Sequence, residues 1–187
     1  VNIQLGRSKF VRRAYGIDEI ALVPGSKTVD PEITETNLLI GGQELQIPII
    51  ASAMDGVVDV NMAIELSRLG ALGVLNLEGV QTRYENPKPV IERISSVGKE
   101  EFVTLMQEIY SEEIKEGLIT KRINEIKTQG GIAAVSGTPL AAIKYKKTIE
   151  EAGADIFFLQ ATVVSTEHIG PKGRESLNIS ELCQKMK

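Results

Sequence analysis

The chain has 187 residues, of which 42% are apolar and 25% charged, with a formal net charge of -4. This balance is typical of a globular protein and argues against a nucleic-acid-binding protein, which is usually basic on one face. No apolar run approaches the ~18 residues of a membrane-spanning helix, and the first residues lack the pattern of a signal peptide. Because Cys183 is the single cysteine, no internal disulfide can form, and we expect a cytoplasmic protein with no membrane or nucleic-acid partner.

Residues 1–46 are polar and turn-rich, with Pro24, Pro31 and Gly41-Gly42 between short strand-like runs. We interpret them as an amino-terminal arm that covers the bottom of the following domain. The basic cluster from Arg7 to Arg13 could steer an anionic ligand, although a solvated surface is the simpler interpretation.

Apolar segments then alternate with helical patterns. One helix is expected after Asp59 and ends at Gly70, and another follows Thr138, with Pro139 first, and ends at Gly153. The apolar segments predict strands over residues 47–53, 71–76, 131–136 and 155–160. This alternation is typical of an α/β fold in which consecutive parallel strands lie side by side.

The chain between the second and third predicted strands is longer than one crossover needs. Apolar residues at helical spacing predict a helix over 89–96 and two more within 98–128. We interpret 98–128 as a helical insertion packed on the outside of the domain, because its apolar stripes are too narrow to enclose a core. Trimming it is expected to leave substrate and cofactor specificity unchanged.

Three predicted strands end in small polar residues. These are Ser52-Ala53-Met54-Asp55, Gly137-Thr138-Pro139 and Gln160-Ala161-Thr162. Since βα folds bind ligands at the carboxyl ends of their strands, we expect Ser52, Met54, Gly137 and Thr162 to share one rim. Each could instead be a cap or turn residue, and Asp55 fits a structural role at a helix start.

Three segments in order resemble the IMP dehydrogenase/GMP reductase family: AYGIDEIALVP (14–24), IPIIASAMD (47–55) and MAIELSRLGALGVLN (62–76). Two later segments, GGIAAVSGTP (130–139) and AGADIFFLQATVVSTEH (152–168), resemble the family's third and fourth barrel strands. Within this family, the segments most resemble the bacterial IMP-dehydrogenase-related branch, whose members lack CBS domains. The resemblance implies the amino-terminal half of a (β/α)8 TIM barrel with four parallel βα units. Because a barrel takes about 250 residues, we expect the other half in a longer gene product.

The resemblance also implies a function. A full-length member would be a homo-oligomeric oxidoreductase, a tetramer in the family, that exchanges hydride between NAD or NADP and the purine C2 of IMP or GMP. It implies that Ser52 and Met54 bind the purine nucleotide, and that the cofactor is bound by Gly137, Thr138, Gln160 and Thr162. The family usually has an aspartate and two serines where this chain has Gln160-Ala161-Thr162, so an amide replaces a carboxylate.

No residue of the chain is a candidate catalytic group or metal ligand. Cys183 lies in ISELCQKMK, an amphipathic helix where a thiol is usually packing, and not in the glycine-rich loop of the family's cysteine. His168 has Glu167 beside it and is expected to be a solvent-facing loop residue. The isolated chain should therefore be inactive, and its open sheet edges should make it aggregate, dimerise or stay partly molten. The alternative is a non-catalytic purine-nucleotide-binding or regulatory paralogue.

Overall fold

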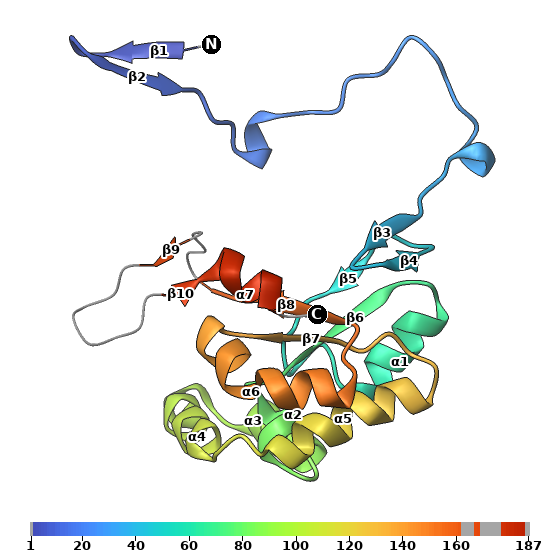
Figure 1. The fold of residues 1–187 in the computed structure, drawn as a ribbon, viewed down its shortest axis with the longest axis vertical. Helices are drawn as coiled ribbons and strands as arrows, with labels where there is room; N and C mark the ends of the chain where they lie inside the picture. Colours follow the sequence, from blue (N-terminus) through green and yellow to red (C-terminus); the bar gives the residue numbers. More distant parts are fainter. Residues whose placement is uncertain (1, 162–166, 169–176, 186–187) are drawn as a thin grey trace. The chain divides into compact units, whose positions relative to one another are not determined.

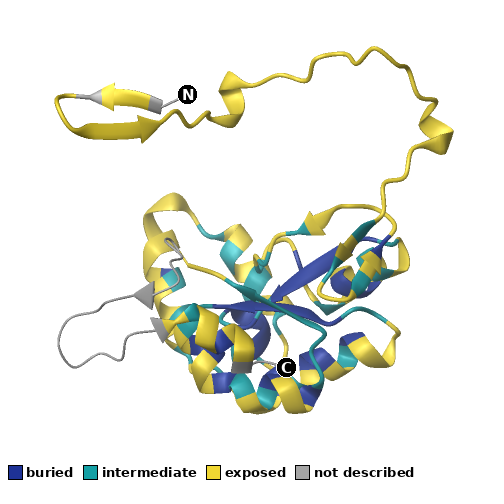
Figure 2. Ribbon diagram, turned by 45° about the horizontal axis from the view of Figure 1, so that its top comes forward, coloured by how far each residue is buried: buried dark blue, intermediate teal, exposed yellow. Residues whose placement is uncertain are grey.

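The computed structural model describes residues 2–161, 167–168 and 177–185 (Figure 1). The chain divides into two compact units, Val1–Glu35 and Thr36–Lys187, which are described separately. In the first unit, β1 (Asn2–Leu5) pairs antiparallel with β2 (Lys9–Arg12), and two short 3₁₀ turns follow. Every residue of this unit whose burial is described is exposed, so the hairpin has no apolar core of its own (Figure 2).

The second unit is built on a parallel sheet. Its strands are β5 (Ile50–Ala51), β6 (Leu72–Asn76), β7 (Ala134–Gly137) and β8 (Ile156–Leu159), hydrogen-bonded in the order β5-β6-β7-β8. Every neighbouring pair is parallel. The prediction of four adjacent parallel strands in chain order is confirmed, with strands shorter than the sequence pattern suggested.

Seven α-helices are described: α1 (Val60–Arg68), α2 (Val80–Arg83), α3 (Lys88–Ser96), α4 (Lys99–Ser111), α5 (Glu116–Thr128), α6 (Pro139–Ala152) and α7 (Ile179–Lys185). The Asp59 carboxylate accepts the Met62 amide at 2.7 Å and caps α1. The Thr138 hydroxyl accepts the Ala141 amide at 3.3 Å, and α6 ends at Gly153 with φ 76°. These helix limits follow the sequence prediction. None of the described helices is long and apolar enough to cross a bilayer.

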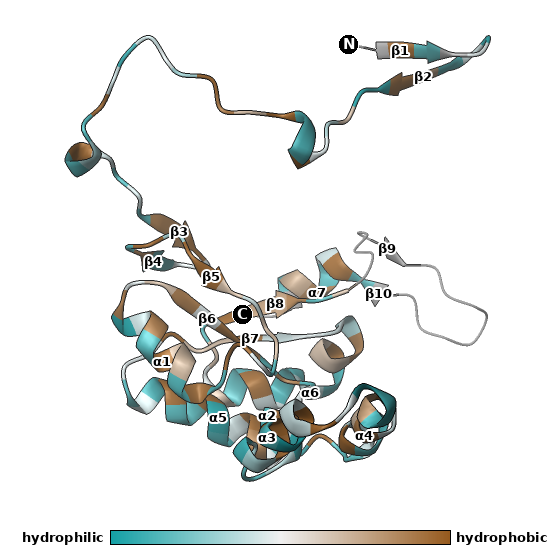
Figure 3. Ribbon diagram, turned by 180° about the vertical axis from the view of Figure 1, so that it is seen from behind, coloured by the Kyte–Doolittle hydropathy of each residue, from teal (hydrophilic) through white to brown (hydrophobic). Residues whose placement is uncertain are grey.

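The two faces of the sheet have different cores because side chains alternate along each strand. Leu75 and Val135 pack against the face covered by α1, α5 and α6, where Ile119 and Ile123 are fully buried (Figures 1 and 3). Leu72, Val74 and Ala134 point to the opposite face. There they meet Leu45 of the hairpin formed by β3 (Leu38–Ile40) and β4 (Gln43–Leu45), within the predicted arm. Each fully buried leucine contributes about 2 kcal/mol of transfer free energy.

The two helices within 98–128 have different surroundings. Helix α5 contacts α1 and α6 and so completes the layer that covers the sheet, as a crossover helix does. Helix α4 instead contacts α2 and α3, and its Leu105 and Ile109 form a small separate core with Val80. The prediction that 98–128 is helical is confirmed, and the part beyond an ordinary crossover is α3 with α4. The division into arm, insertion and partial barrel stays a prediction.

Candidate functional site at the carboxyl ends of the strands

The turn after β5 exposes the two residues predicted to bind a nucleotide. The Met54 amide donates to the Ser52 carbonyl at 2.8 Å, and the Val57 and Val58 amides donate to the Met54 carbonyl. This tight turn leaves Ser52 exposed and Met54 55% exposed. A hydroxyl and a thioether therefore face solvent at the carboxyl end of a parallel strand, where ligands of βα folds bind.

Asp55, in the same turn, points inward to a junction with two other segments. Its Oδ2 accepts the Val80 amide at 2.9 Å and the Tyr110 hydroxyl at 2.5 Å. Its Oδ1 is buried and has no hydrogen-bond partner among the described residues. A Cβ on Gly79 would lie 1.9 Å from Oδ1, so only glycine permits this approach. Asp55 is thus structural, as expected, but it serves the start of α2 and not that of α1.

Tyr110 reaches this junction from α4. Burial first, and then the bond to Asp55, raise the pKa of Tyr110 well above its ordinary value, so its hydroxyl remains the donor at neutral pH. The Arg83 guanidinium lies 5.5 Å from the centre of the Tyr110 ring and donates to the Glu78 carbonyl at 3.1 Å. The Tyr84 hydroxyl also binds α4, at the Ile109 carbonyl, 3.1 Å away.

The amino end of α6 is occupied by a side chain of the same protein. Glu78 Oε2 accepts the Thr138 amide at 2.5 Å, and Oε1 accepts the Thr138 hydroxyl at 3.1 Å. This helix terminus was expected to suit an anionic ligand. A phosphate could reach these groups only if Glu78 moved.

Two further polar residues, Asn76 and Ser136, lie at the carboxyl ends of β6 and β7, on the sheet face that carries Val74 and Ala134. The buried Ser136 hydroxyl donates to Gln160 Oε1 at 3.2 Å, and Asn76 Oδ1 accepts the Glu78 amide at 3.0 Å. Neither residue was among the site residues expected from the sequence. The signal was available, since each is a polar residue two positions after an apolar residue of that face, Val74 or Ala134.

The carboxyl ends of β5, β7 and β8 lie at one edge of the sheet, which brings Ser52, Met54, Gly137, Thr138 and Gln160 to the same rim. Their binding roles stay predictions, and Thr162 lies outside the described residues. The expectation that His168 lies in a loop was wrong, because it lies in the short strand β9 (Glu167–His168), which pairs antiparallel with β10 (Leu177–Asn178). Cys183 is exposed, so the expectation that its thiol is packed was wrong; its neighbour Leu182 is buried instead.

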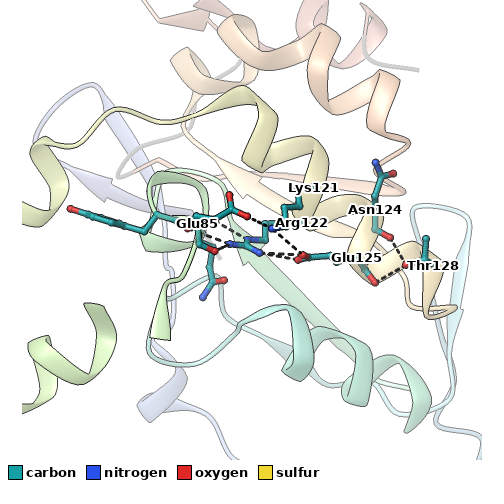
Figure 4. A network of polar contacts seen from close by, with 8 residues as sticks. Glu85, Lys121, Arg122, Asn124, Glu125 and Thr128 are labelled. Carbon is teal, nitrogen blue, oxygen red and sulfur yellow. Dashed lines mark hydrogen bonds and ion pairs between the residues drawn. The ribbon is translucent and has the colours of Figure 1, made fainter. Parts of the chain in front are cut away.

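Beside the turn after β5, a groove of about 990 Å³ opens between α1, α3 and α5, with Asp55 and Gln81 in its lining. Arg122, only 6% exposed, lies in its wall and donates to the carbonyls of Gln81 at 3.0 Å and Glu85 at 2.7 Å (Figure 4). Arg122 thereby satisfies carbonyl groups that the end of α2 leaves without helical partners. Among the described residues, no cluster of His, Cys, Asp and Glu could hold a metal ion.

Comparison with known proteins identifies the family. The IMP dehydrogenase / GMP reductase domain matches residues 14–170. The chain belongs to this family. An uncharacterized oxidoreductase of Mycolicibacterium smegmatis is 28% identical over 98% of the chain and 50% of its own length. An inosine-5'-monophosphate dehydrogenase of Methanocaldococcus jannaschii is 43% identical over 35% of the chain and 13% of its own length. The chain spans about half the length of the curated relatives that it matches over almost its whole length.

A solved structure supports the same assignment. The IMP dehydrogenase/GMP reductase-like protein of Corynebacterium glutamicum superposes with a TM-score of 0.80 at 25% identity. The match covers 90% of this chain and 46% of that one. The predicted fold class, four parallel βα units corresponding to the amino-terminal half of a TIM barrel, is confirmed.

Proposed function

We propose that this chain serves a purine-nucleotide oxidoreductase, in which hydride passes between NAD or NADP and the purine C2 of IMP or GMP. The observation that carries the proposal is the turn after β5 in a member of this family. It exposes Ser52 and Met54 at the end of the sheet where βα folds bind ligands. We further propose that the protein at its relatives' length is a cytoplasmic homo-oligomer.

In this proposal the Ser52 hydroxyl donates a hydrogen bond to the ribose phosphate of the nucleotide, and Met54 packs its polarizable side chain on the purine. A bound nicotinamide cofactor would supply or accept the hydride. Thr138 and Gln160, with Gly137 and Thr162, would contact neutral parts of the cofactor. Its phosphates do not fit at Thr138, because the Glu78 carboxylate already accepts the amide and hydroxyl there. We assign no catalytic residue in this chain.

A second candidate is a non-catalytic purine-nucleotide-binding or regulatory paralogue. Gln160 favours it, because an amide stands where the family usually has a carboxylate, and its Oε1 already accepts the Ser136 hydroxyl. Both candidates bind a nucleotide, but only the first turns it over.

Calorimetric titration of the protein at its relatives' length with IMP and with GMP tests the binding that both candidates share. Ser52→Ala should weaken the Kd about tenfold, the value of one hydrogen bond to a charged group. Ser95→Ala is the matched control, since the exposed Ser95 hydroxyl donates only to the Glu92 carbonyl on α3. Failure of the wild-type protein to bind either nucleotide would contradict both candidates.

Turnover then separates the two candidates. A protein of the relatives' length should reduce NAD with IMP or oxidise NADPH with GMP, whereas the 187-residue chain alone should do neither. Binding without turnover in the longer protein supports the paralogue. Turnover by the 187-residue chain that Cys183→Ala abolishes would contradict our assignment of no catalytic residue here.

A further inference from the structure

The hydroxyl of Tyr110 joins the added helix α4 to the turn that carries Ser52 and Met54. It donates to Asp55 Oδ2 at 2.5 Å, a length typical of a hydroxyl bound to a carboxylate. Resting on the function proposed above, we propose that Tyr110 is a positioning residue through which α4 sets the nucleotide affinity of this turn.

The turn depends on this bond because Asp55 has few other partners. Oδ1 has none among the described residues, and Oδ2 would keep only the Val80 amide if the tyrosine hydroxyl were removed. A partly buried carboxylate that accepts only one hydrogen bond lowers its free energy by turning toward water. Met54 directly precedes Asp55 and its amide binds the Ser52 carbonyl, so a movement of Asp55 displaces both exposed residues.

Helix α4 is firmly placed for this role. Arg93 on α3 makes two hydrogen bonds, at 2.9 and 3.0 Å, to the Glu108 carboxylate on α4. Ile109 is buried against Val80, and the Tyr84 hydroxyl binds the Ile109 carbonyl. Contacts with both α2 and α3 therefore hold Glu108 and Ile109, the two residues of α4 that directly precede Tyr110.

The sequence had suggested that trimming 98–128 would leave specificity unchanged. Affinity is a separate quantity, and we expect it to fall on trimming because the same segment supplies Tyr110. Any change that displaces the end of α4, including its removal, should weaken nucleotide binding without touching Ser52 or Met54.

The test compares Tyr110→Phe with Tyr84→Phe in the intact protein. Both variants lose one hydroxyl that links α4 to the rest of the unit, but only the first loses a bond to Asp55. Two quantities are measured: the NMR shift of the Met54 methyl group, assigned by Met54→Leu, and the Kd for IMP and GMP. Tyr110→Phe should move the Met54 resonance and weaken binding roughly tenfold. Tyr84→Phe should change neither, because Ile109 packed on Val80 and the Arg93–Glu108 pair still hold α4 in place.

Each outcome decides the inference. An unmoved Met54 resonance in Tyr110→Phe overturns it, and so does an unchanged Kd for a nucleotide that the wild type binds. An equal shift of the resonance in both variants overturns it as well. A moved resonance in a protein that binds neither nucleotide supports the positioning of the turn and defeats only the proposed function. If Tyr110→Phe does not fold, Asp55→Asn weakens the same bond by removing the acceptor's charge, and an unmoved Met54 in that variant overturns the inference.

Discussion

The turns after β5 and β7 lie at the same edge of the sheet but differ in how their polar groups are used. After β7, the Thr138 amide and hydroxyl both bind the Glu78 carboxylate. After β5, Asp55 takes the internal bonds while Ser52 and Met54 remain exposed. A helix start therefore is not by itself a free anion site, and a turn presents free side chains only when another of its residues anchors it.

Both turns are anchored by the segment that follows β6. Glu78 binds the turn after β7, and its neighbours Gly79 and Val80 receive the carboxylate of the turn after β5. This segment thus sets the spacing between the proposed nucleotide and cofactor contacts. Nothing in the sequence around Glu78 pointed to this role, although the segment follows a strand that lies between β5 and β7.

The largest effect should come from Gly79→Ala, which breaks the anchor of the turn after β5. The new Cβ would lie 1.9 Å from Asp55 Oδ1, so Asp55 must leave the Val80 amide and the Tyr110 hydroxyl. We expect a loss of about 3 kcal/mol in the free energy of unfolding, measured by urea denaturation. Gly117→Ala is the control: its Cβ meets no atom within 4 Å and should stabilise helix α5. Equal stability of the two variants would contradict the junction.

A smaller loss should follow Arg122→Met, which removes the support at the other end of α2. The carbonyls of Gln81, Tyr84 and Glu85 would lose their donor inside the protein, at a cost of about 2 kcal/mol. The adjacent Lys121→Met on the same helix is the control, because the ion pairs of Lys121 with Glu85 and Glu125 are solvent-exposed and its loss should cost much less. Denaturation midpoints that fall equally for both would show that burial of Arg122 is unimportant.

Glu78→Gln tests the occupied turn after β7. The neutral amide keeps one acceptor for Thr138 but loses the charge, so we expect a loss of about 1 kcal/mol. Without the carboxylate, inorganic phosphate should bind at the start of α6. It should then raise the melting temperature of the variant but not that of the wild type. Equal stabilisation of both by phosphate would mean that Glu78 does not guard this site.

Much of the fold could be predicted from the sequence because its signals are local. Asp59, Thr138 and Gly153 mark helix limits through their own backbone and side-chain chemistry, and each was placed correctly. Apolar runs located all four strands of the parallel sheet. The role of α5 could not be predicted, because its apolar stripe shows that it packs but not on which elements.

The site was less predictable because its bonds join distant segments. Asp55 and Tyr110 are 55 residues apart, and Glu78 and Thr138 are 60 apart. No spacing rule connects such pairs. The exposure of Ser52 and Met54 agrees with a binding turn, but the bond that fills the α6 terminus could appear only with the strands assembled.

The smallest effect concerns Tyr110 at alkaline pH and is absent at neutral pH. Because the pKa of Tyr110 is raised in the folded state, its contribution to stability is fully present below its unfolded pKa of about 10. Stability is lost as the pH rises from there through the folded pKa, since the unfolded chain releases this proton more readily. Tyr110→Phe removes the group that titrates, so the difference in unfolding free energy between wild type and variant should be constant up to about pH 10 and shrink above it.

Urea denaturation at a series of pH values measures this difference. Ser95→Ala removes no titrating group and keeps the bond between Tyr110 and Asp55, so its curve should run parallel to that of the wild type across the alkaline range. A Tyr110→Phe curve that also stays parallel above pH 10 would mean that the hydroxyl is not held by Asp55 in solution. The turn after β5 would then lack the anchor that distinguishes it from the turn after β7.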